Sequence, residues 1–447
     1  MNTVMYPYSR KTRTSVVSFG GLNRQTGIQT GQFSEMRGLS TASLPQITTH
    51  KGQTVVRTYE GAVQGLASCA AGLACAAGGK LYIDGTARLS GLSEGRKTIL
   101  QFWSKVCVFP DKKYYDTDTG ETGQIGTGTY PEAGSAPDID FAVVHDNRIF
   151  GLSGKMLYAC KPGDLTDWTT FVDDDGLPAD NGAYALQMPG AGSYQGIASY
   201  SGHVIAFTES EMKMLYGTMP SKYSFVTACA FGCADNRSIA QARDSVFYLS
   251  SYGVHRFAGS VPVNAGLCLG SVPPAAIGAG TERCYYLAAG RLLYEYDTYN
   301  ETWTVVREYD SEIAGLCVHE GALYAVCADG TLWRHGTQDE VSFSGTLAPV
   351  LGSISEKMRM TRLDVRYELA AGAELIVSAS CDGGAFVPVL REAGTQETTP
   401  QIRTRRITLP KCRSYTLRVE GRGHMVLYDI QQTVCIGSDV DAGRMTP

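Results

Sequence analysis

The chain has 447 residues and a formal net charge of −5, with 43% hydrophobic and 19% charged residues. Such a balance gives no global attraction for nucleic acid or an anionic membrane, and no apolar stretch reaches the length of a transmembrane helix. The high contents of Gly (51 residues) and Tyr (25 residues) favour a turn-rich β protein over long helices.

The first 50 residues are rich in Ser, Thr, Gln and Gly and have no clear hydrophobic period. We expect an extended N-terminal arm over residues 1–50 that packs along the rest of the protein or reaches a neighbouring chain. A basic cluster lies near the start, but no continuous apolar core follows it, so we do not expect a secretory signal. This pattern predicts a protein made and assembled in a cytosol.

From about residue 55 the chain repeats one hairpin: an apolar strand, a short turn, and a strand that alternates apolar and aromatic residues. The clearest copies are "SVFYLSSYGVHRFAG" (245–259), "RCYYLAAGRLLYEYD" (283–297) and "GALYAVCADGTLWRHG" (321–336). The last three intervals between marker residues are 39 residues each. The markers, one from the second strand of each hairpin, are Tyr82, Tyr115, Tyr158, Tyr216, His255, Tyr294 and Trp333.

Each hairpin has flanking segments that supply two further strands. A run of small and apolar residues such as "VQGLASC" (63–69) precedes it, and segments such as "NETWTVVRE" (300–308) and "DWTTFVD" (167–173) follow. Four short strands in about 40 residues are typical of a propeller blade. We therefore predict an all-β fold with a β-propeller of about seven blades over 51–343, with six or eight as alternatives. Pairing of "TVVRTYEG" (54–61) with the last blade is expected to close it.

The longest interval between markers contains "GDLTDWTTFVDDDGLPADNGAYALQMPGAGS" (163–193), which we expect to form a long loop between blades. Its acidic residues Asp173, Asp174, Asp175 and Asp180 could ligate Ca²⁺. The spacing of an EF-hand is absent, however, and Asp, Gly, Pro and Asn are also the residues that a solvated turn favours. We interpret the cluster as a turn.

The pattern changes after residue 343 to longer strands with alternating apolar residues, which predicts a small antiparallel β-sandwich over 344–437 and a loose tail over 438–447. "SASCDGGAFVPV" (378–389) resembles the Asp-box hairpin of sialidases but has one residue too few before the aromatic, so we predict only a tight hairpin. The basic "RTRRITLPKCR" (403–413) fits a solvated edge strand; contact with phosphate or an acidic partner is the alternative.

The residue types that carry out chemistry show no recognisable constellation. None of the seven histidines has a metal-ligand spacing or a nucleophile context, and no phosphate-binding or dinucleotide loop occurs. Most of the 13 cysteines sit singly in apolar runs without zinc-ligand spacing, which favours buried packing residues. We predict no catalytic, cofactor-binding or metal-ligating residue, no cofactor, and no enzymatic activity.

Four parts of the chain resemble the propeller-type virion proteins of tailed bacteriophages, which include the tail-nozzle and packaged-DNA-stabilisation proteins of short-tailed phages and related tail or neck proteins. They are "SFGGLNRQTGIQTGQFSEMRGLS" (18–40), "GDLTDWTTF" (163–171), the adjacent hairpin segments 196–225 and 238–262, and "LPKCRSYTLRVEGRGHMVLYDIQQ" (409–432). The chain departs from the nozzle-type members because it lacks an extended insertion that would build a long nozzle.

The resemblance implies a structural protein of the virion tail or head–tail connector, assembled in the cytoplasm of a bacterial host. Its partners would be other tail, neck or portal-associated proteins and further copies of itself in an oligomeric ring, with non-specific proximity to channel DNA and no membrane insertion. It carries over no catalytic residue. A lectin-like tail protein that binds host glycan is the alternative function, and a glycan hydrolase or lyase would require paired carboxylates at one pocket.

Overall fold

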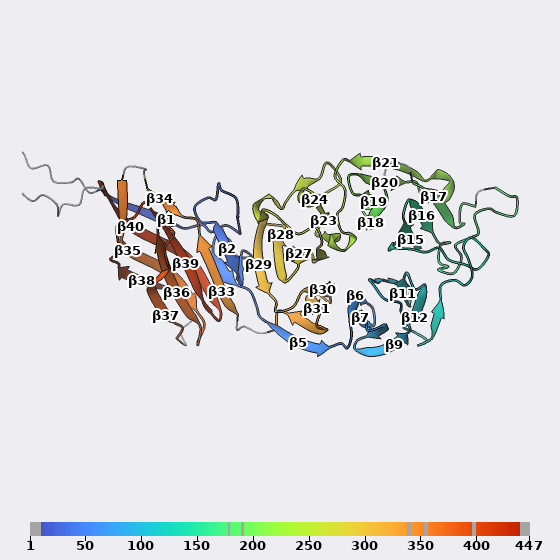
Figure 1. Ribbon diagram of the computed structural model, residues 1–447, viewed down its shortest axis with the longest axis horizontal. Coiled ribbons are helices and arrows are strands. Elements are labelled where there is room, and N and C mark those ends of the chain that lie inside the picture. The colour runs from blue at the N-terminus through green and yellow to red at the C-terminus, as the bar shows by residue number, and fades with distance from the viewer. Residues whose placement is uncertain are drawn as a thin grey trace, which may run out of the picture.

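The computed structural model describes residues 10–177, 179–188, 192–337, 341–352, 356–395 and 399–438, and these form an all-β protein (Figure 1). Their strands make seven four-stranded antiparallel sheets and two six-stranded sheets, an organisation consistent with a β-propeller joined to a second β module. The small sheets lie at one end of the elongated molecule and the two large sheets at the other (Figure 1). No helix in the described ranges is long and apolar enough to cross a membrane.

Each small sheet uses four strands that lie close together in the sequence, except the last, which takes β5 from near the N-terminus. In chain order the small sheets are β6–β9 (Val63–Cys69, Gly72–Ala77, Lys80–Ile83, Thr86–Ser90), β10–β13 (Thr98–Phe102, Lys105–Phe109, Lys113–Asp116, Thr122–Gln124), β14–β17 (Phe141–His145, Arg148–Ser153, Met156–Ala159, Tyr184–Gln187), β18–β21 (Tyr194–Tyr200, His203–Thr208, Met212–Tyr216, Ser224–Cys229), β22–β25 (Ala240–Ala242, Ser245–Ser250, Gly253–Phe257, Val263–Asn264), β26–β29 (Ile277–Gly280, Cys284–Ala289, Leu292–Asp297, Thr302–Glu308), and β30–β32 (Ile313–His319, Ala322–Cys327, Thr331–His335) with β5 (Gln53–Thr58).

The hairpins predicted from the repeat are present, since all seven marker residues lie on the third strand of a different small sheet. The second strand of each sheet is almost wholly buried, because neighbouring sheets cover both of its faces. First strands of most successive sheets contact one another, and β30 returns to β6; β18 instead contacts the short helical turn Asn236–Ser238 that precedes β22. The predicted closing strand is confirmed: β5 pairs with β32, with Val55 opposite Trp333 and Gln53 opposite His335.

The outer strand of the third small sheet was wrongly predicted. The sheet ends with β17, inside the stretch expected to be a loop, whereas "DWTTFVD" (167–173) forms no strand of the sheet. The side chain of Asp167 accepts hydrogen bonds from the backbone N–H groups of Thr169 and Thr170, and this local turn replaces an extended conformation. Trp168 is buried there and donates its indole N–H to the Leu165 carbonyl at 2.7 Å.

The two large sheets combine strands from both ends of the chain. One sheet has the order β3-β4-β40-β35-β38, with β1 also on β40, and the other has the order β2-β33-β39-β36-β37, with β34 also on β39. Their bounds are β1 Arg10–Val16, β2 Phe33–Arg37, β3 Leu39–Ser40, β4 Ile47–Thr49, β33 Ser342–Leu347, β34 Val350–Leu351, β35 Glu356–Leu369, β36 Glu374–Cys381, β37 Val387–Ala393, β38 Gln401–Arg406, β39 Ser414–Arg422 and β40 Met425–Ser438.

The described N-terminal residues pack along the rest of the protein, as one of the two expectations for residues 1–50 had it, but they do so partly as paired strands. The long strand β40 pairs with β35 along one edge, and β1 and β4 cover its other edge. Covering that edge satisfies backbone groups that would otherwise face solvent. Residues 1–9 and 439–447 lie outside the described residues, so the predicted loose tail over 438–447 is not described beyond Ser438, the last residue of β40.

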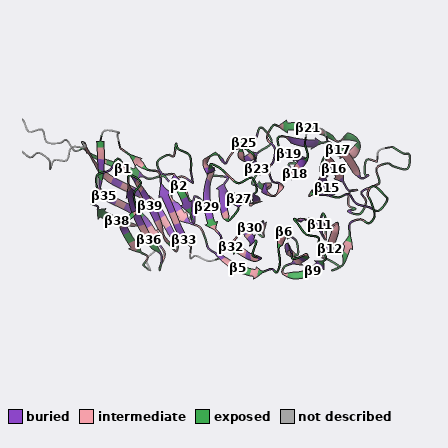
Figure 2. Cartoon of the chain, in the orientation of Figure 1, coloured by how far each residue is buried: buried purple, intermediate pink, exposed green. Residues whose placement is uncertain are grey.

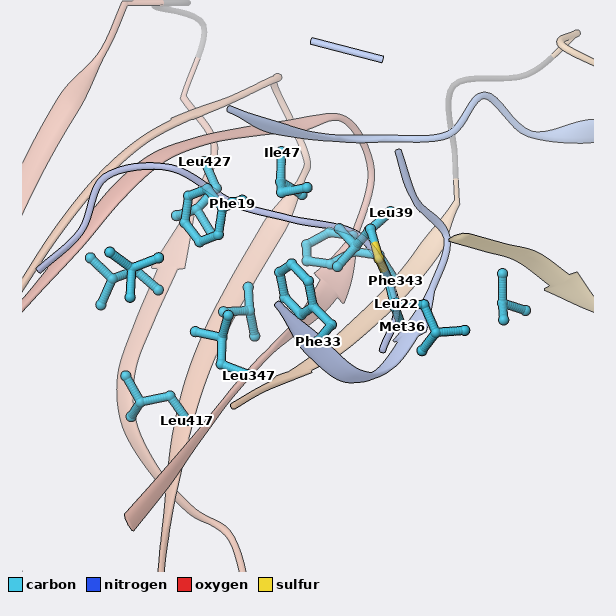
Figure 3. Packing of buried hydrophobic residues seen from close by; sticks show 14 of the residues in the cluster. Phe19, Leu22, Phe33, Met36, Leu39, Ile47, Phe343, Leu347, Leu417 and Leu427 are labelled. Carbon is cyan, nitrogen blue, oxygen red and sulfur yellow. The ribbon is translucent and has the colours of Figure 1, made fainter. Parts of the chain in front are cut away.

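The largest apolar cluster joins the two parts of the molecule. Phe33, Leu39 and Ile47 of the N-terminal segment are fully buried against residues of the C-terminal strands (Figure 3). The same cluster includes Trp303 on β29, so it continues into the small sheets. Exposed positions instead concentrate on outer strands such as β9 and β21 (Figure 2).

Candidate functional site

A cleft of about 1150 Å³ lies where the small sheets meet the large ones. The chain crosses between the two parts at residues 50–52 and again after His335, and the Gly336 N–H donates to the Gly52 carbonyl at 2.8 Å. Strands β27, β28 and β29 contribute lining residues from the small sheets, and the turns at 370–373 and 422–424 contribute them from the large sheets. Both crossing segments thus contribute directly to the cleft.

Three histidines that are far apart in the sequence line this cleft: His50, His335 and His424. The His50 ring lies 3.1 Å from the Thr304 hydroxyl and the His424 ring 3.2 Å from the Thr49 hydroxyl. His335 Nε2 lies 2.6 Å from the hydroxyl of Tyr309, a residue behind the cleft wall. Each imidazole therefore has a hydrogen-bond partner from another segment of the chain.

The acidic group of the cleft is Glu295 on β28, whose residue is 8% exposed. Its Oε1 lies 4.0 Å from Nε2 of His50, so a protonated His50 would form an ion pair with it. Burial, followed by the charge of Glu295, raises the pKa of Tyr286 far above its usual value. Tyr286 therefore stays a neutral hydrogen-bonding group beside the carboxylate.

His335 is held in its neutral form. Burial, together with the nearby charges of His50 and Arg307, lowers its pKa to about 3. A neutral imidazole can exchange a hydrogen bond with Tyr309 without an unpaired charge in the wall. Because its ring is neutral at pH 7, His335 cannot act as a proton donor in acid–base chemistry there.

The cleft joins separate segments of the chain and offers polar groups for binding. Its polar groups bond across chain segments, and Lys51 and Arg422 add positive charge to the lining. Arg422 is 3.3 Å from Glu374. Within the described ranges, no group of three or more His, Cys, Asp or Glu residues could hold a metal ion. The chemistry available here is the binding of a polar or anionic group.

The sequence did not predict this cleft. The register of β5 with β32, which the closing strand implied, would have placed the residues before Gln53 beside those after His335. The sequence could therefore have placed His50 near His335. No sequence pattern linked His424, because its place depends on β4 pairing with β40.

The remaining four histidines lie elsewhere and bond locally. His145 is paired with Ser199 at 2.9 Å and His319 with Ser68 at 2.9 Å, in each case between the first strands of neighbouring sheets. Those contacts tie neighbouring sheets together. The other two rings bond within their own sheets: His203 with the Leu215 carbonyl and His255 with the Ser250 hydroxyl.

The acidic cluster of the long loop builds turns. Asp173 accepts hydrogen bonds from the backbone N–H groups of Asp175 and Leu177 at 3.0 and 2.9 Å. Asp180 accepts from the Ser221 hydroxyl at 2.7 Å. Asp174 and Asp175 are exposed. These contacts agree with the interpretation of the segment as a solvated turn.

The sialidase-like stretch forms the predicted tight hairpin between β36 and β37. The Ser380 hydroxyl donates to the Gly384 carbonyl at 2.6 Å. Asp382 accepts from the backbone N–H groups of Arg413 and Ser414, both at 2.8 Å, while the Phe386 ring lies under the Arg418 guanidinium. The polar side chains of Ser380 and Asp382 thus bond to the turn itself and to the residues at the start of the neighbouring strand.

The basic stretch begins on β38, which is an edge strand as predicted. Arg403 and Arg405 lie 3.0 and 3.3 Å from the carboxylate of Glu392 on β37. This pairing links the edges of the two large sheets. All 13 cysteines are free, and most are buried; burial raises the pKa of Cys107 to about 12, which suits the predicted packing role.

No protein-family model and no curated protein matches the chain. Among solved structures, the computationally designed Ika8 protein is 13% identical at a TM-score of 0.41, covering 64% of this chain and 100% of its own. BamB from Moraxella catarrhalis is 12% identical at 0.41, covering 67% and 96%. PorZ from Porphyromonas gingivalis is 10% identical at 0.43, covering 69% and 44%. Matches at these TM-scores establish neither a family nor a function for this chain. Its own strands define it as an all-β protein.

Proposed function

We propose that this chain is a non-enzymatic structural protein of a tailed-bacteriophage virion, located in the tail or head–tail neck. The proposal begins from the four parts of the sequence that resemble that family. In finer terms, each four-stranded sheet is taken as one blade of a seven-bladed propeller, and the two six-stranded sheets are taken as the C-terminal sandwich.

The observation that best supports a structural role is the place of segment 18–40, one of the parts that carries the resemblance. The Leu22 N–H donates to the Trp303 carbonyl at 2.7 Å, and the Gly38 N–H donates to the Val305 carbonyl at 3.0 Å. The same segment contributes β2, which pairs with β33 of a large sheet. It therefore bonds the small sheets to the large ones, which suits a part that must keep its shape inside an assembly.

The polar groups of the cleft agree with this role. His50 bonds to Thr304, so an imidazole from the crossing segment contacts a strand of the small sheets. His424 bonds to Thr49 within the large sheets. These side chains hold segments of the chain together. A net charge of −5 would also let DNA pass a ring of copies without strong adhesion.

Mass spectrometry and immunogold electron microscopy of tailed particles from cells that encode the chain would test the proposal. The expected result is the protein in purified particles, with label at the tail or neck, and particles that lose their tails or packaged DNA when its gene is deleted. Particles that lack the protein and remain intact after the deletion would refute the proposal.

One observation favours the lectin-like alternative. Trp103 occupies the turn between β10 and β11, is 67% exposed, and has a positive φ of 54°, which is rare for a bulky residue. Its indole N–H donates to Asn147 Oδ1 at 2.7 Å, so the ring is held in one orientation. A fixed, exposed indole beside an amide is suited to stacking against a sugar ring.

A glycan array with the purified protein tests this alternative. Binding that is lost in Trp103→Ala and kept in Tyr252→Ala, another exposed aromatic in a hairpin turn, would favour the lectin function. Equal signals for the two variants would remove it.

A further inference from the structure

A second cavity of about 300 Å³ adjoins the cleft at the joint between the small and large sheets. It shares part of its wall with the cleft, including Lys51 and His335. Residues from both crossing segments line it, together with the end of β29 and the start of β33. The cavity therefore sits at the place where the two parts of the molecule are connected.

One buried donor in this wall has no partner. Gln53 is 7% exposed, and its Oε1 accepts a hydrogen bond from the Tyr309 hydroxyl at 3.0 Å. Its Nε2 is buried and has no hydrogen-bond partner among the described residues. Buried polar groups are nearly always hydrogen-bonded, and a bound ion or water is one explanation for an exception.

The charges around this donor are mainly positive. Arg37 and Glu308 form an ion pair with each other, and Arg291 also lies 3.8 Å from Glu308. Lys51 and Arg307 line the same cavity and form no ion pair within the described ranges. The Arg307 guanidinium lies 5.9 Å from the Tyr309 ring centre and 5.8 Å from that of Trp333, so two aromatic rings restrict its position.

The neutral state of His335 fits the same picture. The ring bonds to Tyr309, which also bonds to Gln53, so the three side chains form one chain of hydrogen bonds. The charge of Arg307 disfavours protonation of this ring. Arg307 and Lys51 therefore keep positive charge that no carboxylate of the described structure neutralises.

We infer that this cavity binds an oxyanion, a phosphate or carboxylate group of a small molecule. Gln53 donates its free amide N–H to an oxygen of the anion, and Lys51 and Arg307 supply charge and further donors. Hydrogen bonds from charged donors to oxyanions are among the stronger ones in proteins. Because both crossing segments line the cavity, the bound anion stabilises the joint, and it does so whether or not the protein belongs to a virion.

Isothermal titration calorimetry with inorganic phosphate and, separately, with citrate tests the inference at constant ionic strength. The purified full-length chain is compared with Lys51→Gln, Arg307→Gln and the matched control Arg334→Gln, an exposed arginine on β32 that does not line the cavity. Saturable binding is expected, weakened about tenfold or more in the first two variants and unchanged in the control. Preference for phosphate or for citrate identifies the oxyanion.

Gln53→Glu provides a second test, since it places a carboxylate where the free amide is. This variant is expected to fold, as measured by its circular dichroism spectrum, and to lose anion binding. The inference is overturned if neither anion binds the parent protein up to millimolar concentration, or if Lys51→Gln and Arg307→Gln bind as the control does.

Discussion

The contact between segment 18–40 and the small sheets can be broken by adding a single methyl group at Gly21. A Cβ at this position would lie 2.6 Å from the Trp303 carbonyl oxygen, 2.8 Å from Thr302 Cβ and 3.1 Å from the Trp303 backbone nitrogen. Two of these are backbone atoms of a strand that carries a fully buried indole. They cannot move aside as the end of a flexible side chain could.

The expected cost of Gly21→Ala follows from three terms. Overpacking in a well-packed region costs about 1–3 kcal/mol, and displacement of the segment also weakens the Leu22 to Trp303 hydrogen bond, which contributes about 1 kcal/mol. The lower entropy of the unfolded chain returns about 0.4–1 kcal/mol. We therefore expect a net loss of about 2 kcal/mol in the free energy of unfolding.

Urea unfolding followed by tryptophan fluorescence measures this loss. Gly27→Ala is the matched control, because the same methyl group there meets no atom within 4 Å. The control is expected to unfold at the urea concentration of the parent protein or slightly above it, and Gly21→Ala clearly below. Coincident midpoints for the two variants would refute the idea that this segment bonds the two parts together.

Three further predictions concern closure, acid stability and a buried ion pair. Gly330→Ala should lower the free energy of unfolding by about 2 kcal/mol more than Gly321→Ala. Both glycines have positive φ, but only at 330 would a Cβ lie 2.1 Å from the Tyr59 carbonyl oxygen, next to the closing strand. Equal losses for the two variants in urea unfolding would count against closure by this strand. Because the pKa of His335 is lower in the folded protein, the unfolded chain takes up the extra proton first as the pH falls. The stability that the neutral His335 contributes is therefore complete above pH 6.5 and is lost as the pH falls towards 3. Unfolding midpoints of His335→Gln should depend less steeply on pH in that window, and an unchanged slope would argue against a neutral His335. Lys97 and Asp111 form an ion pair at 2.7 Å, and their side chains are 0% and 5% exposed. Lys97→Met should lower the free energy of unfolding by about 3–5 kcal/mol, because it leaves a buried carboxylate unpaired, and Lys97→Met combined with Asp111→Leu should lower it much less. A double variant whose loss equals the sum of the two single losses would contradict the pairing.

The repeating small sheets could be predicted from sequence because their signal is local. Each hairpin carries its own turn and its own apolar strand, and the closing strand β5 lies directly before the first repeated sheet. The outer strand of the third sheet was predicted at the wrong place, because Asp167 and Trp168 follow the pattern of strand residues but are held in a turn by side-chain hydrogen bonds. Local pattern does not show which segment of a long insertion forms the outer strand.

The large sheets and the cleft depend on pairing over most of the chain length. Strand β1 pairs with β40, with Arg10 opposite Ile436, and nothing in the polar sequence of the first 50 residues specifies that partner. The cleft follows from the pairing of β4 with the same strand β40, since His424 lies at the turn before β40 while Thr49 ends β4. The sequence shows no metal-ligand spacing among its histidines, and the convergence of three of them in the cleft required the fold.

The molar mass of the purified chain by light scattering, alone and after mixing with a lysate that contains tailed particles, tests the proposed assembly most directly. A ring of defined copy number, or stable attachment to tail or neck particles, is the result that the account predicts. A monomer that stays free of the particles would contradict it.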